Sequence, residues 1–332
     1  MKRFVLLGAG FIGAAHARSL AGHRGVDFVG VYDIDPARAR ALAAEHGCEV
    51  LTDVSAAFDP DRVDAVLIAS STDTHAEHLR RAADTGIAVL CEKPIDADLA
   101  AATEIARHVE AAGIPAMVDF NRRYDRDNAE LRRLVAAGEV GAIELIQLTS
   151  RGPVVPPLSY VAVSGGQLRD QTVHFFDLAR WIAAADPVEV YATGSPLAEP
   201  RLADYGDIDT SVAVLKLPSG ALVQIDSVRR TGYGYDERIE VHGSTGLVEA
   251  RRQQTGGVLR YRAGGVVGDA LHPGWFDRVA LTYPAALDAF VTALEGGPAT
   301  YPTLADGLKA QAVAEAATRS LTSGRTEPIT YP

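Results

Sequence analysis

A glycine-rich turn between a short apolar run and a helix constrains the fold of this chain most strongly. Residues 8–13 read Gly-Ala-Gly-Phe-Ile-Gly, directly after Val5-Leu6-Leu7 and before Ala14–Leu20, which predicts a helix. In this spacing the first glycine permits a tight turn, the second lets the backbone approach a pyrophosphate, and the third lets helix and strand pack closely. The helix N-terminus then favours bound phosphate. The residues predicted to make these contacts are Gly8, Gly10, Phe11, Ile12 and Gly13.

An acidic residue at the end of the next apolar run indicates which dinucleotide is bound. The run Phe28–Tyr32 ends in Asp33, 20 residues after Gly13. A carboxylate at this position can accept both hydroxyls of an adenosine ribose and repels a 2′-phosphate, so we predict NAD rather than NADP. Asp33 could instead cap the helix that begins near Pro36, a role for which Asp35 competes.

The same N-terminus can also be read as a secretory signal. Lys2-Arg3, an apolar stretch and Ala15-His16-Ala17 resemble such a signal and its cleavage site. However, three glycines at the dinucleotide spacing interrupt the stretch, and cleavage would remove the first strand of the α/β pattern. We therefore expect no export; a mature protein that lacks Met1–Leu20 would contradict this.

Composition and charge exclude several other classes of protein. With 32 basic and 43 acidic residues and no basic cluster, the chain is not expected to bind nucleic acid. No run of 18 apolar residues exists, so no membrane span is expected. Cys48 and Cys91 form no Cys-x-x-Cys pair, which favours reduced thiols in the cytoplasm. His75 and His78 have no third ligand in sequence, so we expect no metal site.

Strand and helix patterns alternate over the first 120 residues. Amphipathic stretches such as Ala37–His46 and Ala76–Thr85 predict helices, and the apolar runs between them predict strands at 3–7, 27–32, 63–69, 87–91 and 115–119. Continuous apolar strands alternating with helices indicate a doubly wound parallel sheet that is covered on both faces. We predict a dinucleotide-binding Rossmann domain over residues 1–121.

From residue 122 the pattern becomes α+β. A helix is predicted over Asp127–Ala136 and a strand over Ile143–Thr149. The later segments alternate with period 2 and predict an antiparallel sheet from strands at 188–192, 210–217, 221–228, 238–242 and 247–250. Helices are predicted near 284–295 and 304–322. Since an open parallel sheet binds its ligand beyond the carboxyl ends of its strands, we expect residues 122–332 to form a second domain that faces this edge and binds the substrate.

Glu92-Lys93-Pro94 follows the predicted strand 87–91, at the carboxyl edge of the sheet. A lysine there can reach a substrate hydroxyl that lies over a nicotinamide; an exposed loop lysine is the alternative. Pro94 biases Lys93 away from helical angles and makes a cis bond possible.

The stretch after Gly165-Gly166 predicts a helix on which two chemically useful residues share a face. Asp170 and His174 are four residues apart, and Asp177 follows three later. A carboxylate beside an imidazole can fix its tautomer and raise its basicity, as a proton-transferring histidine requires. A buried histidine held by a structural carboxylate is the alternative.

A glycine-rich loop between two predicted strands carries Tyr233 and Tyr235. Tyrosines at this place either line a pocket for a polyol or lie at an interface or rim.

Taken together, these motifs resemble the Gfo/Idh/MocA oxidoreductase family. The resemblance rests on the glycine turn, Glu92-Lys93-Pro94, Asn121-Arg122-Arg123-Tyr124-Asp125, and the spacing of Asp170, His174 and Asp177. Residues 234–244 are similar to the inositol 2-dehydrogenase branch, and the similarity covers essentially the whole chain.

The resemblance implies that Lys93 contacts nicotinamide and substrate, and that Asp170 and His174 complete the catalytic set. It also implies a cyclic polyol or sugar as substrate, and dimers or tetramers formed through the open face of the second sheet. The further cofactor contacts expected are Ser70, Ser71, His75, Glu92 and Lys93. The substrate contacts expected are Lys93, Arg122, Asp170, His174, Tyr233 and Tyr235.

Two positions depart from the inositol dehydrogenase pattern. Phe175 and Gly152 stand where that branch usually carries acids, in His-Asp-Phe-Asp and Ser-Arg-Asp-Pro. Acids are natural partners of vicinal hydroxyls, so their loss favours an inositol isomer, a related polyol or a sugar over myo-inositol itself.

We therefore predict an NAD-dependent dehydrogenase that oxidises a secondary alcohol on a cyclic polyol. His174 would take the hydroxyl proton, Asp170 would orient His174, and Lys93 would stabilise the developing alkoxide. The roles of Lys93 and His174 could be exchanged, because a desolvated lysine can also act as a base. The alternatives are an NAD-dependent glycoside-cleaving enzyme of the same family and a non-catalytic NAD-binding sensor.

Overall fold

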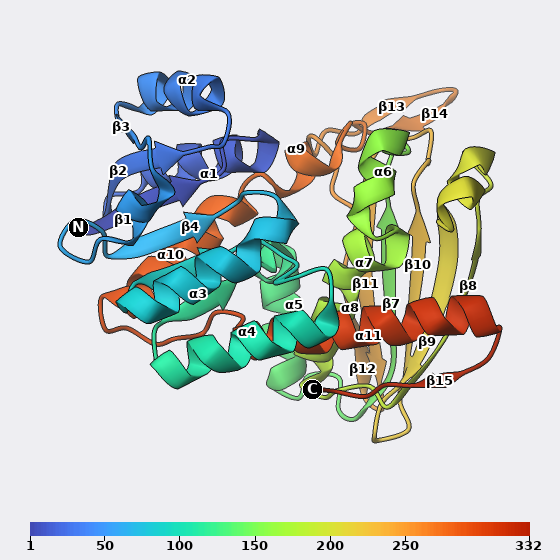
Figure 1. The fold of residues 1–332 in the computed structure, drawn as a ribbon. Helices are drawn as coiled ribbons and strands as arrows, with labels where there is room; N and C mark the ends of the chain where they lie inside the picture. The colour runs from blue at the N-terminus through green and yellow to red at the C-terminus, as the bar shows by residue number, and fades with distance from the viewer. The chain divides into compact units, whose positions relative to one another are not determined.

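The computed structural model describes all 332 residues, and the chain divides into two compact units (Figure 1). The first unit comprises residues 1–124 together with Leu281–Leu308 and Pro332, and the second comprises Asp125–Ala280 and Lys309–Tyr331. None of the helices combines the length and the apolar character that a membrane span requires.

A six-stranded parallel sheet forms the centre of the first unit. Its strand order is β3-β2-β1-β4-β5-β6, which is the Rossmann order. The strands are β1 (Lys2–Leu7), β2 (Val26–Tyr32), β3 (Glu49–Val50), β4 (Ala65–Ile68), β5 (Ala88–Cys91) and β6 (Ala116–Val118). The predicted doubly wound parallel sheet is thus confirmed. The two-residue strand β3 is the one that the apolar pattern did not reveal.

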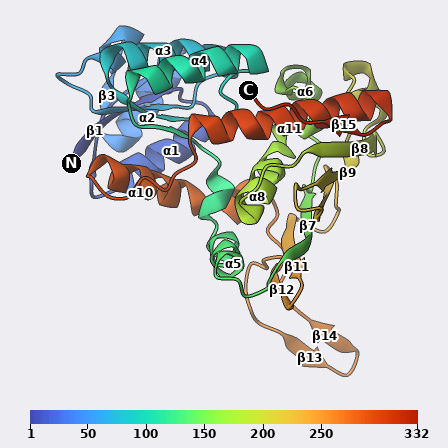
Figure 2. The ribbon, with the colours of Figure 1, turned by 90° about the horizontal axis from the view of Figure 1, so that it is seen from below.

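Helices cover both faces of this sheet (Figures 1 and 2). One face carries α1 (Phe11–Gly22), α2 (Pro36–His46) and α10 (Thr282–Leu294); the other carries α3 (His75–Thr85) and α4 (Leu99–Ala112). Short 3-10 turns connect the elements at η1 (Val54–Phe58), η2 (Thr72–Thr74) and η3 (Asn121–Tyr124).

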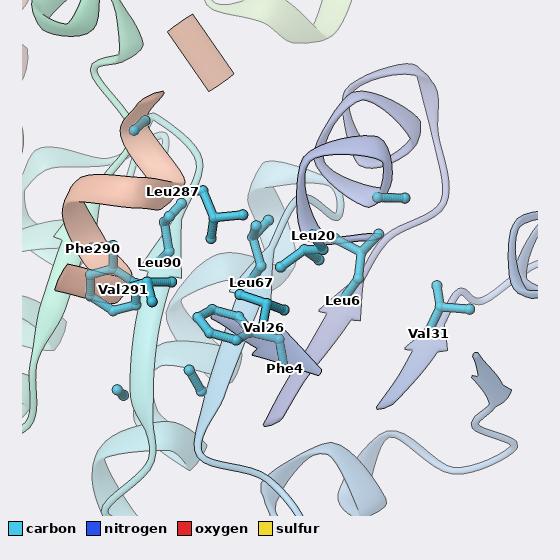
Figure 3. Close-up of a cluster of buried hydrophobic side chains, with 14 of the residues drawn as sticks. Phe4, Leu6, Leu20, Val26, Val31, Leu67, Leu90, Leu287, Phe290 and Val291 are labelled. Atoms are coloured by element: carbon cyan, nitrogen blue, oxygen red, sulfur yellow. The ribbon is translucent and has the colours of Figure 1, made fainter. Parts of the chain in front are cut away.

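Helix α10 completes the core of the first unit although it comes about 160 residues after β6. Leu287, Phe290 and Val291 of α10 lie beside Leu67 and Leu90 of the sheet (Figure 3), and all five side chains are buried. The ring of Phe290 meets the ring of Phe4 edge-on at 6.4 Å. The predicted second domain, 122–332, included this helix. Amphipathic spacing indicates that a helix has a buried face, but not which sheet that face covers.

A seven-stranded sheet forms the centre of the second unit, in the order β12-β11-β7-β10-β9-β8-β15. Its strands are β7 (Ile143–Arg151), β8 (Glu189–Ser195), β9 (Thr210–Lys216), β10 (Leu222–Val228), β11 (Asp236–Gly243), β12 (Gly246–Ala250) and β15 (Glu327–Pro328). All pairs are antiparallel except β7 with β10, which run parallel. The sheet is therefore mixed, although largely antiparallel as predicted.

One face of this sheet is covered and the other is open. Helix α8 (Val173–Ala183) packs against β7, and Ser320 of α11 (Leu304–Ser323) accepts a hydrogen bond from the backbone of β8. The remaining helical elements are α5 (Arg126–Ala136), α6 (Leu158–Ser164), α7 (Gln167–Asp170), η4 (Pro200–Tyr205) and α9 (Trp275–Val279). A hairpin of β13 (Arg260–Arg262) and β14 (Gly265–Val267) projects away from β11 and β12 (Figure 2).

The packing of α10 generates a stability prediction. Phe290→Ala should lower the free energy of unfolding by about 3–5 kcal/mol, because it leaves a cavity under the first sheet. Leu281→Ala, at a position that is 85% exposed just before the same helix, should stay within about 0.5 kcal/mol of wild type. Urea unfolding followed by circular dichroism measures both. Amide exchange should accelerate in β1 and β4 of Phe290→Ala but not in β9; the reverse pattern would contradict the assignment of α10 to the first unit.

Candidate active site

The glycine turn contains two glycines whose Cβ would clash with the backbone and a third whose Cβ would meet no protein atom. Gly8 has φ +100°, and a Cβ there would lie 2.4 Å from the carbonyl oxygen of Ala69. A Cβ on Gly13 would lie 2.1 Å from the carbonyl oxygen of Gly8. Gly10, in contrast, has φ −74°, and its Cβ would meet nothing within 4 Å. The fold itself does not require glycine at position 10, so the space beside it fits a ligand that approaches the backbone closely, as a pyrophosphate does.

Helix α1 begins at this turn without a side-chain cap. Gly10 is its N-cap residue and offers no side chain to the first backbone N–H groups. These N–H groups and the positive end of the helix dipole form a site suited to phosphate oxygens. Phe11, in the first turn, is 65% exposed, whereas Ile12 is half-buried.

Asp33 is tied to the glycine turn rather than to the helix that follows it. Its Oδ2 accepts a hydrogen bond from Ala9 N at 2.6 Å, and its Oδ1 accepts one from Asp35 N at 2.7 Å. The N-cap of α2 is Asp35, which accepts from Ala37 N at 2.9 Å. The capping alternative for Asp33 is therefore wrong, and its carboxylate lies beside the turn where an adenosine ribose would be recognised.

Three of the predicted cofactor contacts follow β4: Ser70 and Ser71 lie in the loop, and His75 is the first residue of α3. Ser70 Oγ and Thr74 Oγ1 are 2.7 Å apart, and Ser71 precedes η2 as its N-cap residue. His75 is only 1% exposed, and each ring nitrogen lies within hydrogen-bond distance of a backbone carbonyl: Nδ1 at 2.8 Å from Pro94 O and Nε2 at 3.1 Å from Ser70 O. A direct contact between His75 and a cofactor would have to replace one of these bonds.

Glu92-Lys93-Pro94 leaves the carboxyl end of β5, and the Lys93–Pro94 peptide is cis. Lys93 is half-buried, and its backbone N–H donates to Oε2 of Glu92 at 3.2 Å. The other oxygen of Glu92, Oε1, is 2.9 Å from Nε2 of His16 on α1. The carboxylate of Glu92 thus connects the backbone of Lys93 to helix α1.

A third ionisable group lies beside this pair. Asp119, which follows β6, is 1% exposed, and its Oδ2 is 3.6 Å from Nε2 of His16. Burial and the charge of Glu92 raise the pKa of Asp119 to about 7, against the smaller opposing effects of His16 and Arg122. Burial alone would lower the pKa of His16, but its hydrogen bond to Glu92 and the charges of Glu92 and Asp119 outweigh burial and raise it.

The ligand atoms of His16, Glu92 and Asp119 lie within 4.8 Å of one another, which is close enough to surround a metal ion. A hydrogen bond already joins His16 and Glu92, so the three residues form an ionic network. The absence of a metal site stays a prediction.

Asp170 and His174 belong to the second unit and lie on two helices rather than one. Asp170 is the last residue of α7, and His174 lies in the first turn of α8, so the predicted single helix is wrong. The chain bends between them, where Gln171 Nε2 donates to Ser150 O at 2.9 Å and Thr172 Oγ1 lies 3.0 Å from Ser227 Oγ. The backbone N–H of Thr172 bonds the carbonyl of Gln167, five residues earlier, which interrupts the α-helical pattern, and the two side chains fasten this bend to β7 and β10.

Asp170 is held by two residues that the sequence pattern did not single out. Its Oδ1 accepts from Tyr160 OH at 2.9 Å, and its Oδ2 lies 3.7 Å from Nη2 of Arg229. Arg229 is buried and also pairs with Asp207 at 2.6 Å. No regular spacing connects residues 160, 170 and 229, so only the tertiary structure could reveal this group. Asp177, by contrast, is fully buried and lies 4.0 Å from Arg180, which fits a structural role.

The remaining predicted substrate contacts differ in exposure. Tyr233 is 48% exposed and donates from its hydroxyl to Asp236 at 3.0 Å, whereas Tyr235 is 5% exposed. Arg122, in the first unit, is buried, and its Nη1 donates to Asn121 Oδ1 at 2.8 Å. Tyr233 is thus accessible to a ligand, and Tyr235 lies mostly within the second unit.

The first unit has the features of a class of protein: a parallel sheet in Rossmann order, an uncapped helix at a glycine turn, and an acidic residue at the end of the second strand. These features define a dinucleotide-binding domain. Residues 2–120 match the model of the oxidoreductase family with an NAD-binding Rossmann fold, and residues 128–249 match the GFO/IDH/MocA C-terminal domain. The chain belongs to the Gfo/Idh/MocA family of NAD-binding oxidoreductases, which confirms the predicted family and cofactor.

Curated relatives match almost the full length. The chain is 40% identical over 325 residues to the inositol 2-dehydrogenase of Rhizobium meliloti, covering 97% of this chain and 98% of that protein. It is 35% identical over 324 residues to the myo-inositol 2-dehydrogenase of Thermotoga maritima, covering 97% of each.

Solved structures share the fold. The crystal structure of a myo-inositol dehydrogenase from Corynebacterium glutamicum superposes with a TM-score of 0.94 at 32% identity, with all of both chains covered. That of a myo-inositol dehydrogenase from Lactobacillus casei in complex with NAD(H) and myo-inositol has a TM-score of 0.90 at 25% identity, covering 100% of this chain and 98% of that one.

The glycine turn predicts opposite effects for two similar substitutions. Gly10→Ala should fold normally, within about 0.5 kcal/mol of wild type, because its Cβ meets no protein atom. Its NAD affinity should nevertheless fall about tenfold or more, a loss of about 1.4 kcal/mol, because the methyl group fills the space for the pyrophosphate. Gly13→Ala should instead lose about 1–3 kcal/mol of stability, since α1 must move. Thermal unfolding and NAD titration separate the two; Gly10→Ala with unchanged NAD affinity would contradict the assignment.

The pKa of Asp119 predicts a pH-dependent stability. Because this pKa rises from 3.8 to about 7 on folding, the unfolded chain loses the proton first as pH increases, and stability falls across that window. Asp119→Asn stays neutral and avoids this loss. The unfolding midpoint of the variant minus that of wild type should become more positive from about pH 5 to about pH 8. Asp73→Asn, an exposed position in the same unit, is the control; a difference that stays constant or falls for Asp119→Asn would refute the prediction.

Proposed function

We propose that the protein oxidises a secondary alcohol of an inositol isomer or a closely related cyclic polyol. It is an NAD-dependent dehydrogenase acting on CH–OH groups, similar over nearly its whole length to inositol 2-dehydrogenases. The observation that carries the proposal is the place of Lys93, directly after β5 of a Rossmann sheet whose glycine turn fits NAD. A lysine at this edge is suited to a substrate oxygen beside the nicotinamide.

The cofactor would be held by groups of the first unit. The turn of residues 8–13 and the N–H groups at the start of α1 would bind the pyrophosphate, and Asp33 would accept the adenosine ribose hydroxyls. When bound, NAD supplies a hydride acceptor at nicotinamide C4. Ser70 and Ser71, in the loop after β4, are proposed as further contacts.

The proton chemistry is assigned to three residues. We propose that His174 accepts the hydroxyl proton of the substrate and that Asp170 orients His174. The support for Asp170 is its fixed position between Tyr160 and Arg229, which holds its carboxylate in one place. Lys93 donates to the same substrate oxygen and stabilises its developing negative charge. The exchange of roles between Lys93 and His174 stays an alternative within the proposal.

The preferred isomer depends on the two departures from the family pattern. Phe175 is 1% exposed on α8, so this position contributes to the core of the second unit rather than to a surface. Gly152 is different: the nearest atom to a Cβ there would be Val228 O at 3.8 Å, which leaves room for a side chain. We infer that the missing acid at position 152 changes substrate preference more than Phe175 does. It supports an isomer or relative of myo-inositol as the substrate.

Assembly into dimers or tetramers through the outer face of the second sheet is also part of the proposal. This face carries exposed apolar side chains on neighbouring strands, namely Tyr191, Val212, Val214 and Leu222. Exposed apolar patches of this kind are typical of protein interfaces. The free thiols of Cys48 and Cys91 support the proposed cytoplasmic location.

The substrate proposal is tested by following NADH absorbance against a panel of inositol isomers and aldoses. At least one inositol isomer should give turnover, and His174→Ala should lower kcat for it by about 10²–10⁴, the usual cost of removing a general base. His108→Ala, a histidine on the surface of α4, is the matched control and should stay within about twofold of wild type. Full turnover by His174→Ala would refute its role. Tightly retained NAD with no net NADH would favour the glycoside-cleaving alternative, and NAD binding without turnover would favour the sensor.

Cofactor choice supplies a second test. Asp33→Ser should lower NAD affinity by about tenfold or more, because the carboxylate's charged hydrogen bonds are worth about 1.5–3 kcal/mol. The ratio of kcat/KM for NADP to that for NAD should rise, since the repulsion of a 2′-phosphate is removed. Asp35→Ser preserves a capping side chain for α2 and should leave this ratio unchanged. An unchanged ratio in Asp33→Ser would contradict the assignment of Asp33.

A further inference from the structure

We propose that two buried histidines, His16 and His75, are positioning residues for Lys93, which they hold by fastening the residues on either side of it. His16 binds the side chain of residue 92 from α1, and His75 binds the backbone of residue 94 from α3. The inference rests on the proposed function, because it assigns a purpose to the placement of Lys93. We call residues 92–94 together with these two histidines the lysine clamp.

The first arm of the lysine clamp runs through a carboxylate. Nε2 of His16 is 2.9 Å from Oε1 of Glu92, and Oε2 of Glu92 accepts from Lys93 N at 3.2 Å. The imidazole is itself confined, since it is 1% exposed and meets the ring of Tyr283 edge-on at 5.1 Å. Asp119 lies on its other side at 3.6 Å. The peptide nitrogen of Lys93 is therefore fastened to the first helix of the sheet.

The second arm fastens the residue after the lysine. Nδ1 of His75 lies 2.8 Å from Pro94 O, and Nε2 lies 3.1 Å from Ser70 O. A neutral imidazole carries one N–H, so it donates to one of these two carbonyls at a time. Both acceptors are backbone carbonyls, and His75 is 1% exposed. His75 therefore ties the loop after β5 to the loop after β4, both at the carboxyl edge of the sheet.

The two arms fix the backbone of Lys93, whereas its long side chain remains flexible. Four flexible methylene groups separate the ammonium of lysine from its backbone, so the position of Cα decides which substrate atom it can reach. A misplacement of about 1 Å near a reacting group can cost about 10²-fold in rate. Burying two imidazoles and two acids is costly, and a core of apolar residues would be the cheaper way to pack these helices. Because these buried groups lie on both sides of Lys93, we infer that they are kept to position this lysine despite the free energy of burying them.

The test is a double-mutant cycle with Lys93 in the intact enzyme. At saturating NAD, His16→Ala and His75→Ala should each lower kcat for the best polyol by about tenfold to a hundredfold. In a Lys93→Ala background the same substitutions should cost less than about threefold, because the residue that they position is gone. His78→Ala is the matched control, since His78 is also buried on α3 but stacks on Phe58; it should have little effect in either background.

Conservative variants separate positioning from general damage. The amide nitrogen of Gln can replace Nε2, and that of Asn can replace Nδ1. His16→Gln and His75→Asn should therefore recover most of the activity that the alanine variants lose, at similar unfolding midpoints. If each histidine substitution costs the same factor with and without Lys93, the histidines act through something other than the lysine, and the proposal is overturned. If an alanine variant does not fold, the double-mutant cycle with Lys93→Ala is measured with His16→Gln and His75→Asn instead.

A chemical readout keeps this proposal distinct from the proposed function. The chain has four lysines, so acetylation of Lys93 by a water-soluble reagent can be followed by peptide mass spectrometry with Lys2, near the N-terminus, as internal reference. In His75→Ala the rate at Lys93 should change by about threefold or more relative to Lys2, whereas in His78→Ala it should not. An unchanged rate overturns the lysine clamp even if wild type oxidises a polyol. A changed rate supports the clamp even if wild type oxidises none, in which case the proposed function alone fails.

Discussion

The close approach of helix α1 to the end of strand β1 is the constraint on which the first unit depends. At Gly13 the helix lies so near the carbonyl of Gly8 that a single methyl group would be 2.1 Å from its oxygen. This contact sets the N-terminus of α1 at the carboxyl edge of the sheet, where unpaired N–H groups can face a pyrophosphate. It also brings His16, one turn later, within hydrogen-bond distance of Glu92. One backbone contact thus serves both the cofactor and the proposed catalytic lysine.

The buried charges of the first unit follow from the same arrangement. His16, Glu92 and Asp119 come from three different elements, and each would be costly to bury alone. The raised pKa values of His16 and Asp119 mean that these two residues hold protons more tightly in the folded protein than in the unfolded chain. The network is therefore stabilised most at low pH, and it loses stability as pH rises through neutrality. Ionic contacts, instead of apolar packing, therefore fix the geometry at the carboxyl edge of the first sheet.

Much of the first unit could be predicted because its signals are local. The strands are continuous apolar runs, and the glycine turn and Asp33 lie within one βαβ segment. The features that were missed are long-range. The apolar face of α10 has no local mark that assigns it to the first sheet, and period-2 alternation does not reveal that β7 and β10 run parallel. At the break between α7 and α8, Gln171 and Thr172 bond to distant strands, which local spacing does not reveal. For the same reason the partners of Asp170, at residues 160 and 229, were not predicted.

Transfer of deuterium tests the central claim most directly. The polyol that is turned over fastest, deuterated at its carbinol carbons, would be oxidised with wild-type protein and NAD, and the product NADH examined by mass spectrometry and NMR. We predict one deuterium at C4 of the nicotinamide for each molecule of polyol oxidised. NADH that carries no deuterium at C4, or consumption of the polyol without net NADH, would contradict net hydride transfer from a polyol.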